Sequence, residues 1–358
     1  MSALRTFGIS LVVTAVALGL GYAYGGFKGL YLLVVLAVLE VSLSFDNAII
    51  NASILKRMSR FWQRMFLTIG ILVAVFGMRL LFPLLIVWAT AGLGPVRAME
   101  LALHPPPHGG LEFPDGSPSY EKLVIAAHPQ IAAFGGIFLL MLFLDFIFYD
   151  REIKWLKWIE IPFARLGRLG RVSLVVTGLV LVLVGTQLTH SSDEAATVLT
   201  AGLLGMVTYL VVNGLGRAFR PSDTEAGAAD AATGWAGLTL FLYLEVLDAA
   251  FSFDGVTGAF AITSDPIVIA LGLGLVGSMF VRSITIYLVR QEALGRYAYL
   301  EHGAHWAIGA LAIIMLGSIE PWFEVPEAFT ASVGVVFIAA ALGWSILRNR
   351  RERQGVTV

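Results

Sequence analysis

The sequence contains no cysteine and has few charged residues. Without cysteine the chain can form no disulfide bond, no thiolate metal site and no thiol nucleophile. Only 14% of its 358 residues are charged, against about 25% in an average soluble domain, and 58% are apolar. Basic and acidic residues nearly balance, at 24 and 25, which argues against a nucleic-acid partner. No nucleotide-binding motif is present, so we expect neither an enzyme nor an organic cofactor.

Apolar runs of about 20 residues recur along the whole chain, and each is long enough to cross a bilayer as a helix. We predict an all-α polytopic membrane protein in which residues 1–358 form a single integral membrane domain. The first run follows Arg5 but lacks a good signal-peptide cleavage site, so we expect it to be retained. Ten spans are predicted, at 7–25, 29–53, 65–89, 129–150, 172–190, 195–216, 235–260, 266–289, 303–320 and 328–347.

Lysine and arginine occur mainly in alternate connections between these runs, and such connections normally face the cytoplasm. With ten spans, all of them fall on one side if both termini are cytoplasmic. The basic connections are 54–64, 151–171, 217–220, 290–296 and the tail at 348–353.

Two connections are unusually long. The segment 151–171 is basic and aromatic, so we expect it to lie along the cytoplasmic headgroups. The segment 90–128 is rich in proline and glycine and is predicted to be extracytoplasmic. It is either a structured hydrophilic cap or a site that captures metal through His104, His108, Glu112, Asp115 and His128.

An acidic motif is repeated without gaps. Residues 38–47 read Val-Leu-Glu-Val-Ser-Leu-Ser-Phe-Asp-Asn, and residues 246–255 read Val-Leu-Asp-Ala-Ala-Phe-Ser-Phe-Asp-Gly. Three pairs therefore correspond: Glu40 with Asp248, Ser44 with Ser252, and Asp46 with Asp254. The next helix after each motif carries an arginine, Arg79 and Arg282 respectively.

The two motifs lie on the second and seventh spans, which are separated by five crossings and therefore run in opposite directions. This is the pattern of an inverted repeat, which places a shared site near the bilayer midplane. We assign repeat 1 to about 29–150 (spans 2–4), linking helices to about 172–216, and repeat 2 to about 235–320 (spans 7–9). Because the two acids of each motif point about 120° apart on a continuous helix, we expect both helices to be interrupted near Ser-Phe-Asp.

Ionised acids inside a bilayer are expensive. Each costs roughly 2.5–3.5 kcal/mol at the centre of a span, so five left unpaired would cost on the order of 12–18 kcal/mol. Arg79 and Arg282 can offset two charges at most. We therefore predict an all-oxygen site for a hard or borderline-hard divalent cation, Mn²⁺, Ca²⁺ or Mg²⁺. The five acids are Glu40, Asp46, Glu245, Asp248 and Asp254, with Ser44 and Ser252 beside them. Asp145, in the fourth span, could relay protons, complete the ion path or pair with Arg79.

The segments 40–48 and 245–256 resemble the two signatures of the TerC (tellurium-resistance membrane protein) family. The long outer loop and ten spans are more similar to its larger, DUF475-type bacterial branch. The resemblance implies a multi-pass protein of the bacterial inner membrane, in a superfamily of cation exporters that favours Mn²⁺ as the cargo, and an association with metal stress and tellurite resistance. Carried over position by position, it implies a metal site formed by Glu40, Asp46, Asn47, Glu245, Asp248 and Asp254. The residues expected around this site or on a proton path are Ser44, Ser252, Arg79, Arg282 and Asp145. One departure is Gly255, where many relatives have serine.

Two functions remain open. The favoured one is a transporter that exports a divalent cation, driven by an ion or proton gradient. The alternative is a membrane scaffold for a metal-stress, tellurite-resistance or secretion complex, in which the acidic cluster is structural. The expected partners are the metal ion and the lipid bilayer, and a homo-oligomer or a membrane complex is left open. An intramembrane aspartyl hydrolase is disfavoured, because Asp254 lacks the preceding glycines expected there.

Overall fold

The computed structural model describes residues 3–43, 45–70, 94–104, 110–218, 232–263, 265–291, 296–323 and 325–353, together with 73, 77 and 106. These residues form helices joined by short connections, and no β-strand is found among them. The prediction of an all-α polytopic fold is therefore confirmed. By length and apolar composition, seven described helices can cross a membrane, or eight if the bent pair α7–α8 counts as one span.

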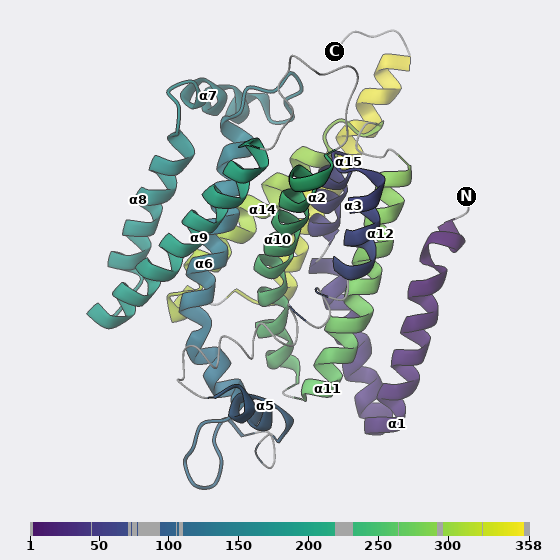
Figure 1. The fold of residues 1–358 in the computed structure, drawn as a ribbon, viewed down its shortest axis with the longest axis vertical. Coiled ribbons are helices and arrows are strands. Elements are labelled where there is room, and N and C mark those ends of the chain that lie inside the picture. The colour runs from purple at the N-terminus through teal and green to yellow at the C-terminus, as the bar shows by residue number, and fades with distance from the viewer. Residues whose placement is uncertain are drawn as a thin grey trace.

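The helices pack side by side into the bundle shown in Figure 1. Their bounds are α1 (Ala3–Leu43), α2 (Phe45–Leu55), α3 (Arg60–Met65), η1 (Phe66–Gly70), α5 (Pro95–Leu103), α6 (Tyr120–Phe148), α7 (Lys157–Gly167), α8 (Val172–Gln187), α9 (Ser192–Ala218), α10 (Gly234–Ile262), α11 (Pro266–Ile269), η4 (Ala270–Gly277), α12 (Ser278–Arg290), α14 (Leu300–Gly317), η5 (Pro321–Phe323) and α15 (Glu327–Arg353). η1 and η4 are π-helices, and each belongs to the span that follows one of the two acidic motifs.

Helix α1 turns back on itself at Gly26, whose φ of 59° and ψ of −147° are not helical. Gly21 and Gly29 meet on the two sides of this turn, where a Cβ on Gly29 would lie 2.5 Å from the Gly21 carbonyl oxygen. The two halves of α1 correspond to the predicted span 7–25 and to the first part of 29–53. Of the predicted span 65–89, everything after residue 70 except residues 73 and 77 is outside the described residues.

Helix α6 forms the centre of the bundle, and 83% of its most apolar stretch is buried. Its glycines allow close packing, since Gly135 and Gly136 lie against the side chains of Met315 and Leu316 on α14. On another side, Gly205 of α9 lies directly on the Phe134 carbonyl. Such contacts let helices approach closely in a bilayer, where burial of apolar surface does not drive helix association.

Large apolar side chains are exposed on the first half of α1, on α8 and on α15. Val12, Leu179 and Val336 are 64%, 61% and 64% exposed. In a membrane these faces contact lipid, which explains the excess of apolar residues over what a soluble core could bury.

The described parts of the basic connections gather at one end of the bundle, together with the start of α1 and the end of α15 (Figure 1). The Ala232 backbone N–H donates to the Arg57 carbonyl at 2.8 Å, Arg151 lies 3.7 Å from Glu301, and Asn349 donates to the Arg296 carbonyl at 2.8 Å. We call this end the basic end; its orientation toward the cytoplasm stays a prediction.

The segment 151–171 folds over the basic end. It contains α7, which bends by 101° from α8. Glu160 is only 5% exposed and anchors the segment, because it accepts hydrogen bonds from the Trp155 and Leu156 backbone N–H groups and from Trp306. Trp158 is 77% exposed, as expected of a helix lying at a membrane surface.

At the opposite end, the described part of segment 90–128 favours a structured cap. Glu112 pairs with Lys122, Asp115 accepts from the Ser117 hydroxyl and backbone, and His104 bonds the carbonyl of Glu100 in its own helix. His128 lies near Ser318, and His108 is outside the described residues. The described residues contain no group of three or more His, Asp or Glu side chains placed to hold a metal.

The contact between Gly205 and the Phe134 carbonyl allows a test of packing. We expect Gly205→Ala to lower the free energy of unfolding by about 1–3 kcal/mol, because a Cβ there overlaps the backbone of α6. Gly178→Ala on α8 is the matched control, since nothing lies within 4 Å of its added Cβ. Unfolding in mixed detergent micelles measures both, and an equal effect of the two substitutions would contradict this packing.

Candidate functional site

The first acidic motif spans the end of α1 and the start of α2, and the second lies within α10. The end of α2 and the start of α10 meet, because Met58 and Ala232 pair through their backbones. Helix α2 therefore runs toward this end of the bundle, and α10 runs away from it. This antiparallel arrangement allows residues of one motif to face residues of the other.

A buried hydrogen bond joins the two motifs. The Asn47 side-chain Nδ2 donates to Asp248 Oδ1 at 2.6 Å, across 201 positions of sequence. Asn47 is 1% exposed and Asp248 is 4% exposed, so the bond is shielded from water and lipid. Hydrogen bonds to a carboxylate are stronger than those between neutral groups.

Glu40 and Glu245 each pack against a glycine of the other repeat. Glu40, on α1, lies against Gly277 of η4, where a Cβ would overlap its side chain. Glu245, on α10, lies against Gly70 of η1, where a Cβ would be 2.6 Å from its Oε1. The two contacts form a crossed pair, in which an acid from each motif-bearing segment meets a π-helix of the opposite repeat.

Both carboxylate oxygens of Glu245 lack a hydrogen-bond partner among the described residues, although the residue is only 6% exposed. The side-chain oxygen of Asn51, one helical turn after Asn47, also lacks one and is 1% exposed. A buried carboxylate in this position is protonated, paired with a cationic side chain or neutralised by a bound cation. Glu245 and Asn51 are therefore oxygen donors that could serve a cation.

Arg282 makes a hydrogen bond to a backbone carbonyl that the sequence did not indicate. Its Nε donates to the Leu67 carbonyl of η1 at 2.9 Å, and its role in offsetting the charge of the acids stays a prediction. A carbonyl in a π-helix is a natural acceptor, because the i→i+5 pattern displaces it from the regular α-helical ladder. Arg282 thus ties α12 of repeat 2 to the π-helix of repeat 1.

The predicted interruption of the second motif is wrong. Helix α10 continues without a break from Gly234 to Ile262, through Ser-Phe-Asp. The interruption predicted for the first motif falls at Ser44, outside the described residues. π-Helical turns lie in the following span of each repeat, at η1 and η4. Gly70 of η1 and Gly277 of η4 lie against Glu245 and Glu40, whereas Gly272 lies against Leu36.

Five predicted residues of the site fall on parts that the structure leaves undescribed. Ser44 and Arg79 are outside the described residues, as are the side chains of Asp46, Ser252 and Asp254. The three acids whose side chains are described, Glu40, Glu245 and Asp248, do not form a three-membered metal-binding group with one another.

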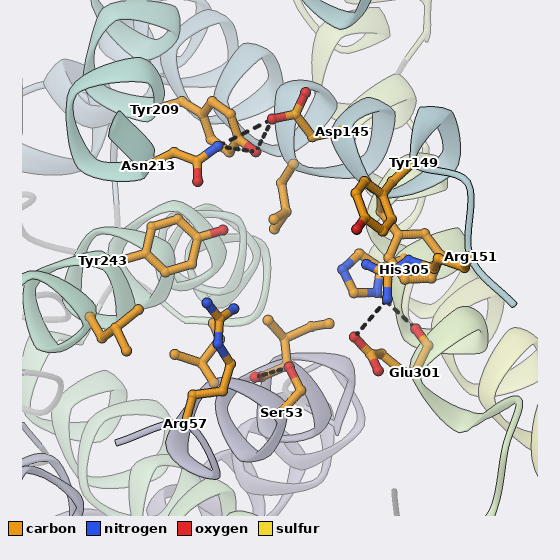
Figure 2. A pocket seen from close by; sticks show the side chains of 15 residues that line it. Ser53, Arg57, Asp145, Tyr149, Arg151, Tyr209, Asn213, Tyr243, Glu301 and His305 are labelled. Atoms are coloured by element: carbon orange, nitrogen blue, oxygen red, sulfur yellow. Dashed lines mark hydrogen bonds and ion pairs between the residues drawn. The ribbon is translucent and has the colours of Figure 1, made fainter. Parts of the chain in front are cut away.

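Asp145 lies in a separate cluster on α6. It accepts a hydrogen bond from Ser173 of α8. It also accepts from the Tyr209 hydroxyl at 2.7 Å and from Asn213 Nδ2 at 3.2 Å (Figure 2). Asn213 and Tyr209 thus join α9 to α6. Tyr209 and Ser173 were missed, although Tyr209 and Asn213, four apart on α9, are a recognisable polar pair on one helix face.

His302 and His305 do not form a metal pair. His302 Nε2 lies 3.0 Å from the Ile153 carbonyl, and His305 Nδ1 lies 2.8 Å from the Glu301 carbonyl. The His305 ring is also stacked on Phe146 at 3.7 Å. Both histidines therefore hold the start of α14 against its neighbours.

The bond between Asn47 and Asp248 predicts energetic coupling between the repeats. In a double-mutant cycle with Asn47→Ala and Asp248→Ala, we expect a coupling of about 1–3 kcal/mol in the free energy of unfolding. Asn47→Ala combined with Asp193→Ala is the control cycle, because Asp193 is exposed at the start of α9. Additive effects of Asn47→Ala and Asp248→Ala would contradict the contact.

The comparisons with known proteins identify a family. A family model described as "Protein of unknown function (DUF475)" matches residues 45–352, which begin at α2 and include all of α10. No curated protein and no solved structure matches the chain. Because the match covers most of the sequence, the chain belongs to the DUF475 family.

Proposed function

We propose that this protein is a transporter of divalent metal cations, with Mn²⁺ as the favoured substrate. The observation that carries the proposal is the meeting of the two acidic motifs at Asn47 and Asp248, beside the buried carboxylate of Glu245. Buried acids at the interface of two antiparallel repeats are typical of secondary transporters. A cation there would offset a charge that the bilayer otherwise penalises.

The donor set supports a hard cation. The described candidates are carboxylate oxygens of Glu40, Glu245 and Asp248 and amide oxygens of Asn47 and Asn51, and the repeat adds Asp46 and Asp254. Oxygen donors favour Mn²⁺, Mg²⁺ or Ca²⁺, whereas Cu⁺ prefers softer sulfur ligands. Export, coupling to protons and a role in tellurite resistance belong to the proposal through the resemblance to the TerC family. So does a bacterial inner-membrane location with both termini cytoplasmic.

The mechanism we propose uses the crossed contacts between the repeats. Movement of one repeat relative to the other would shift Glu40 against Gly277 and Glu245 against Gly70. The π-helices η1 and η4 are suited to this movement, because π-helical turns occur frequently at functional sites and are held less regularly than α-helical turns. The site would then open alternately to each side of the membrane.

The test is Mn²⁺ flux into liposomes containing the purified full-length protein and an internal metal-quenched dye. We expect the wild-type protein to move Mn²⁺, and Glu245→Gln with Asp248→Asn to reduce the rate by at least about tenfold. The reason is that each substitution removes a charged oxygen ligand, and a loss of about 1.4 kcal/mol already corresponds to tenfold. Asp46→Asn with Asp254→Asn should do the same.

Asp193→Asn and Glu152→Gln are matched controls, since both acids are exposed outside the candidate site. They should leave flux within about twofold of wild type, a change of under 1 kcal/mol. Thermal unfolding of each variant in detergent shows whether it is folded. Absence of Mn²⁺, Ca²⁺ and Mg²⁺ movement by the wild type, or full movement by both double variants, would refute transport.

One observation favours the alternative, a membrane scaffold with a structural acidic cluster. The described side chains contain no three-membered metal-binding group, and Asn47 and Asp248 already satisfy part of each other's hydrogen bonding. A scaffold predicts co-purifying membrane proteins, and cellular manganese that does not change when Glu245 and Asp248 are neutralised.

A further inference from the structure

A polar cavity of about 490 Å³ lies apart from the cross-repeat contacts, between α2, α6, α9, α10 and α14 (Figure 2). Several of its lining residues belong to the basic end, where Arg57 follows α2 and Tyr149 and Arg151 follow α6. Tyr149 is 68% exposed and the Arg151 side chain 35%, so the mouth of the cavity is at this end.

The acidic groups of the cavity are held on its walls. Asp145 accepts from Ser173, Tyr209 and Asn213, all on α8 and α9. Glu301 lies 3.7 Å from Arg151, whose guanidinium also lies 4.0 Å over the Phe146 ring. His305, which also lines the cavity, is hydrogen-bonded to the Glu301 carbonyl and stacked on the Phe146 ring.

The guanidinium of Arg57 points toward the middle of the cavity, and so does the Tyr243 hydroxyl (Figure 2). Its backbone is fixed at the junction of α2 and α10, where its carbonyl accepts from the Ala232 N–H at 2.8 Å. A cationic group and a hydroxyl donor thus face the space that a ligand would occupy. A phosphate oxygen fits both, since guanidinium groups bind phosphate through charge-assisted hydrogen bonds.

Apolar side chains line part of the cavity farther from its mouth. Ile50 of α2 and Leu142 of α6 belong to the lining, and each lies seven residues before a residue at the mouth, Arg57 and Tyr149 respectively. Seven residues of helix span about 10 Å, so apolar side chains lie about that far inside the charged mouth. This order, with charge at the membrane surface and apolar surface toward the bilayer interior, matches an amphiphile with an anionic head.

We propose that this cavity binds an anionic phospholipid, with its phosphate between Arg57 and Tyr243 and the start of its acyl chains along Ile50 and Leu142. Basic pockets between helices at the cytoplasmic surface bind anionic headgroups in this manner. The inference does not rest on the proposed transport, because none of these residues belongs to the cross-repeat contacts.

The test is native mass spectrometry of the full-length protein in detergent, titrated with phosphatidylglycerol, phosphatidylcholine or inorganic phosphate. We expect wild-type protein to retain one phosphatidylglycerol in preference to phosphatidylcholine. Arg57→Gln should weaken phosphatidylglycerol binding by about tenfold or more, because it removes the charged contact. Tyr243→Phe should weaken it by a smaller factor, because only a hydroxyl is lost.

Arg60→Gln is the matched control, since it removes the same charge from the same connection at an exposed position outside the cavity. Its affinity should stay within about twofold of wild type, and the melting temperature shows whether each variant is folded. Equal affinity for the two lipids, or equal losses for Arg57→Gln and Arg60→Gln, would overturn the proposal. Displacement of phosphatidylglycerol by millimolar inorganic phosphate would assign the cavity to a soluble anion and overturn the lipid as its occupant.

Discussion

The requirement that every buried polar group find a partner inside the protein governs this structure, because a bilayer offers none. Many Ser and Thr hydroxyls within the described helices meet it by bonding a carbonyl of their own helix, and several other polar side chains meet it by reaching another helix. Asn47 bonds Asp248, Arg282 bonds the Leu67 carbonyl, and Asp145 collects donors from two neighbouring helices. Glu245 stands out against this background, since its buried carboxylate has no hydrogen-bond partner among the described residues.

Glycine residues allow the acids to pack closely against neighbouring helices. At Gly70 and Gly277 the absence of a side chain leaves room for an acid from the opposite repeat, and both glycines lie in π-helical turns. Close approach and irregular backbone therefore coincide at the places where charge is buried. Elsewhere, as between Gly205 and Phe134, the same lack of a side chain serves packing alone.

Much of the fold could be predicted from local pattern. Apolar runs correspond to described helices in all predicted spans except 65–89, most of which is undescribed, and the hairpin at Gly26 separates the first two. The interruption predicted within the second motif is absent, because α10 keeps its helical hydrogen bonds through Ser-Phe-Asp. A π-helical turn occurs instead at η4, which packs against Glu40 from the other repeat. The hydrogen bond of Arg282 could not be predicted from the sequence, since charge counting does not reveal a backbone acceptor in a neighbouring helix.

Composition, apolar run length and the placement of arginine determined the membrane class, the alternation of basic connections and the repeated motif. These properties depend on residues close together in the chain, so they can be read in order along it. The tertiary structure alone decided that Asn47 faces Asp248 across 201 positions, that Glu245 lies on Gly70, and that Asp145 belongs to a different cluster. Such pairings depend on how the helices cross and rotate against one another, which is set by packing over the whole bundle and not by any local stretch of sequence.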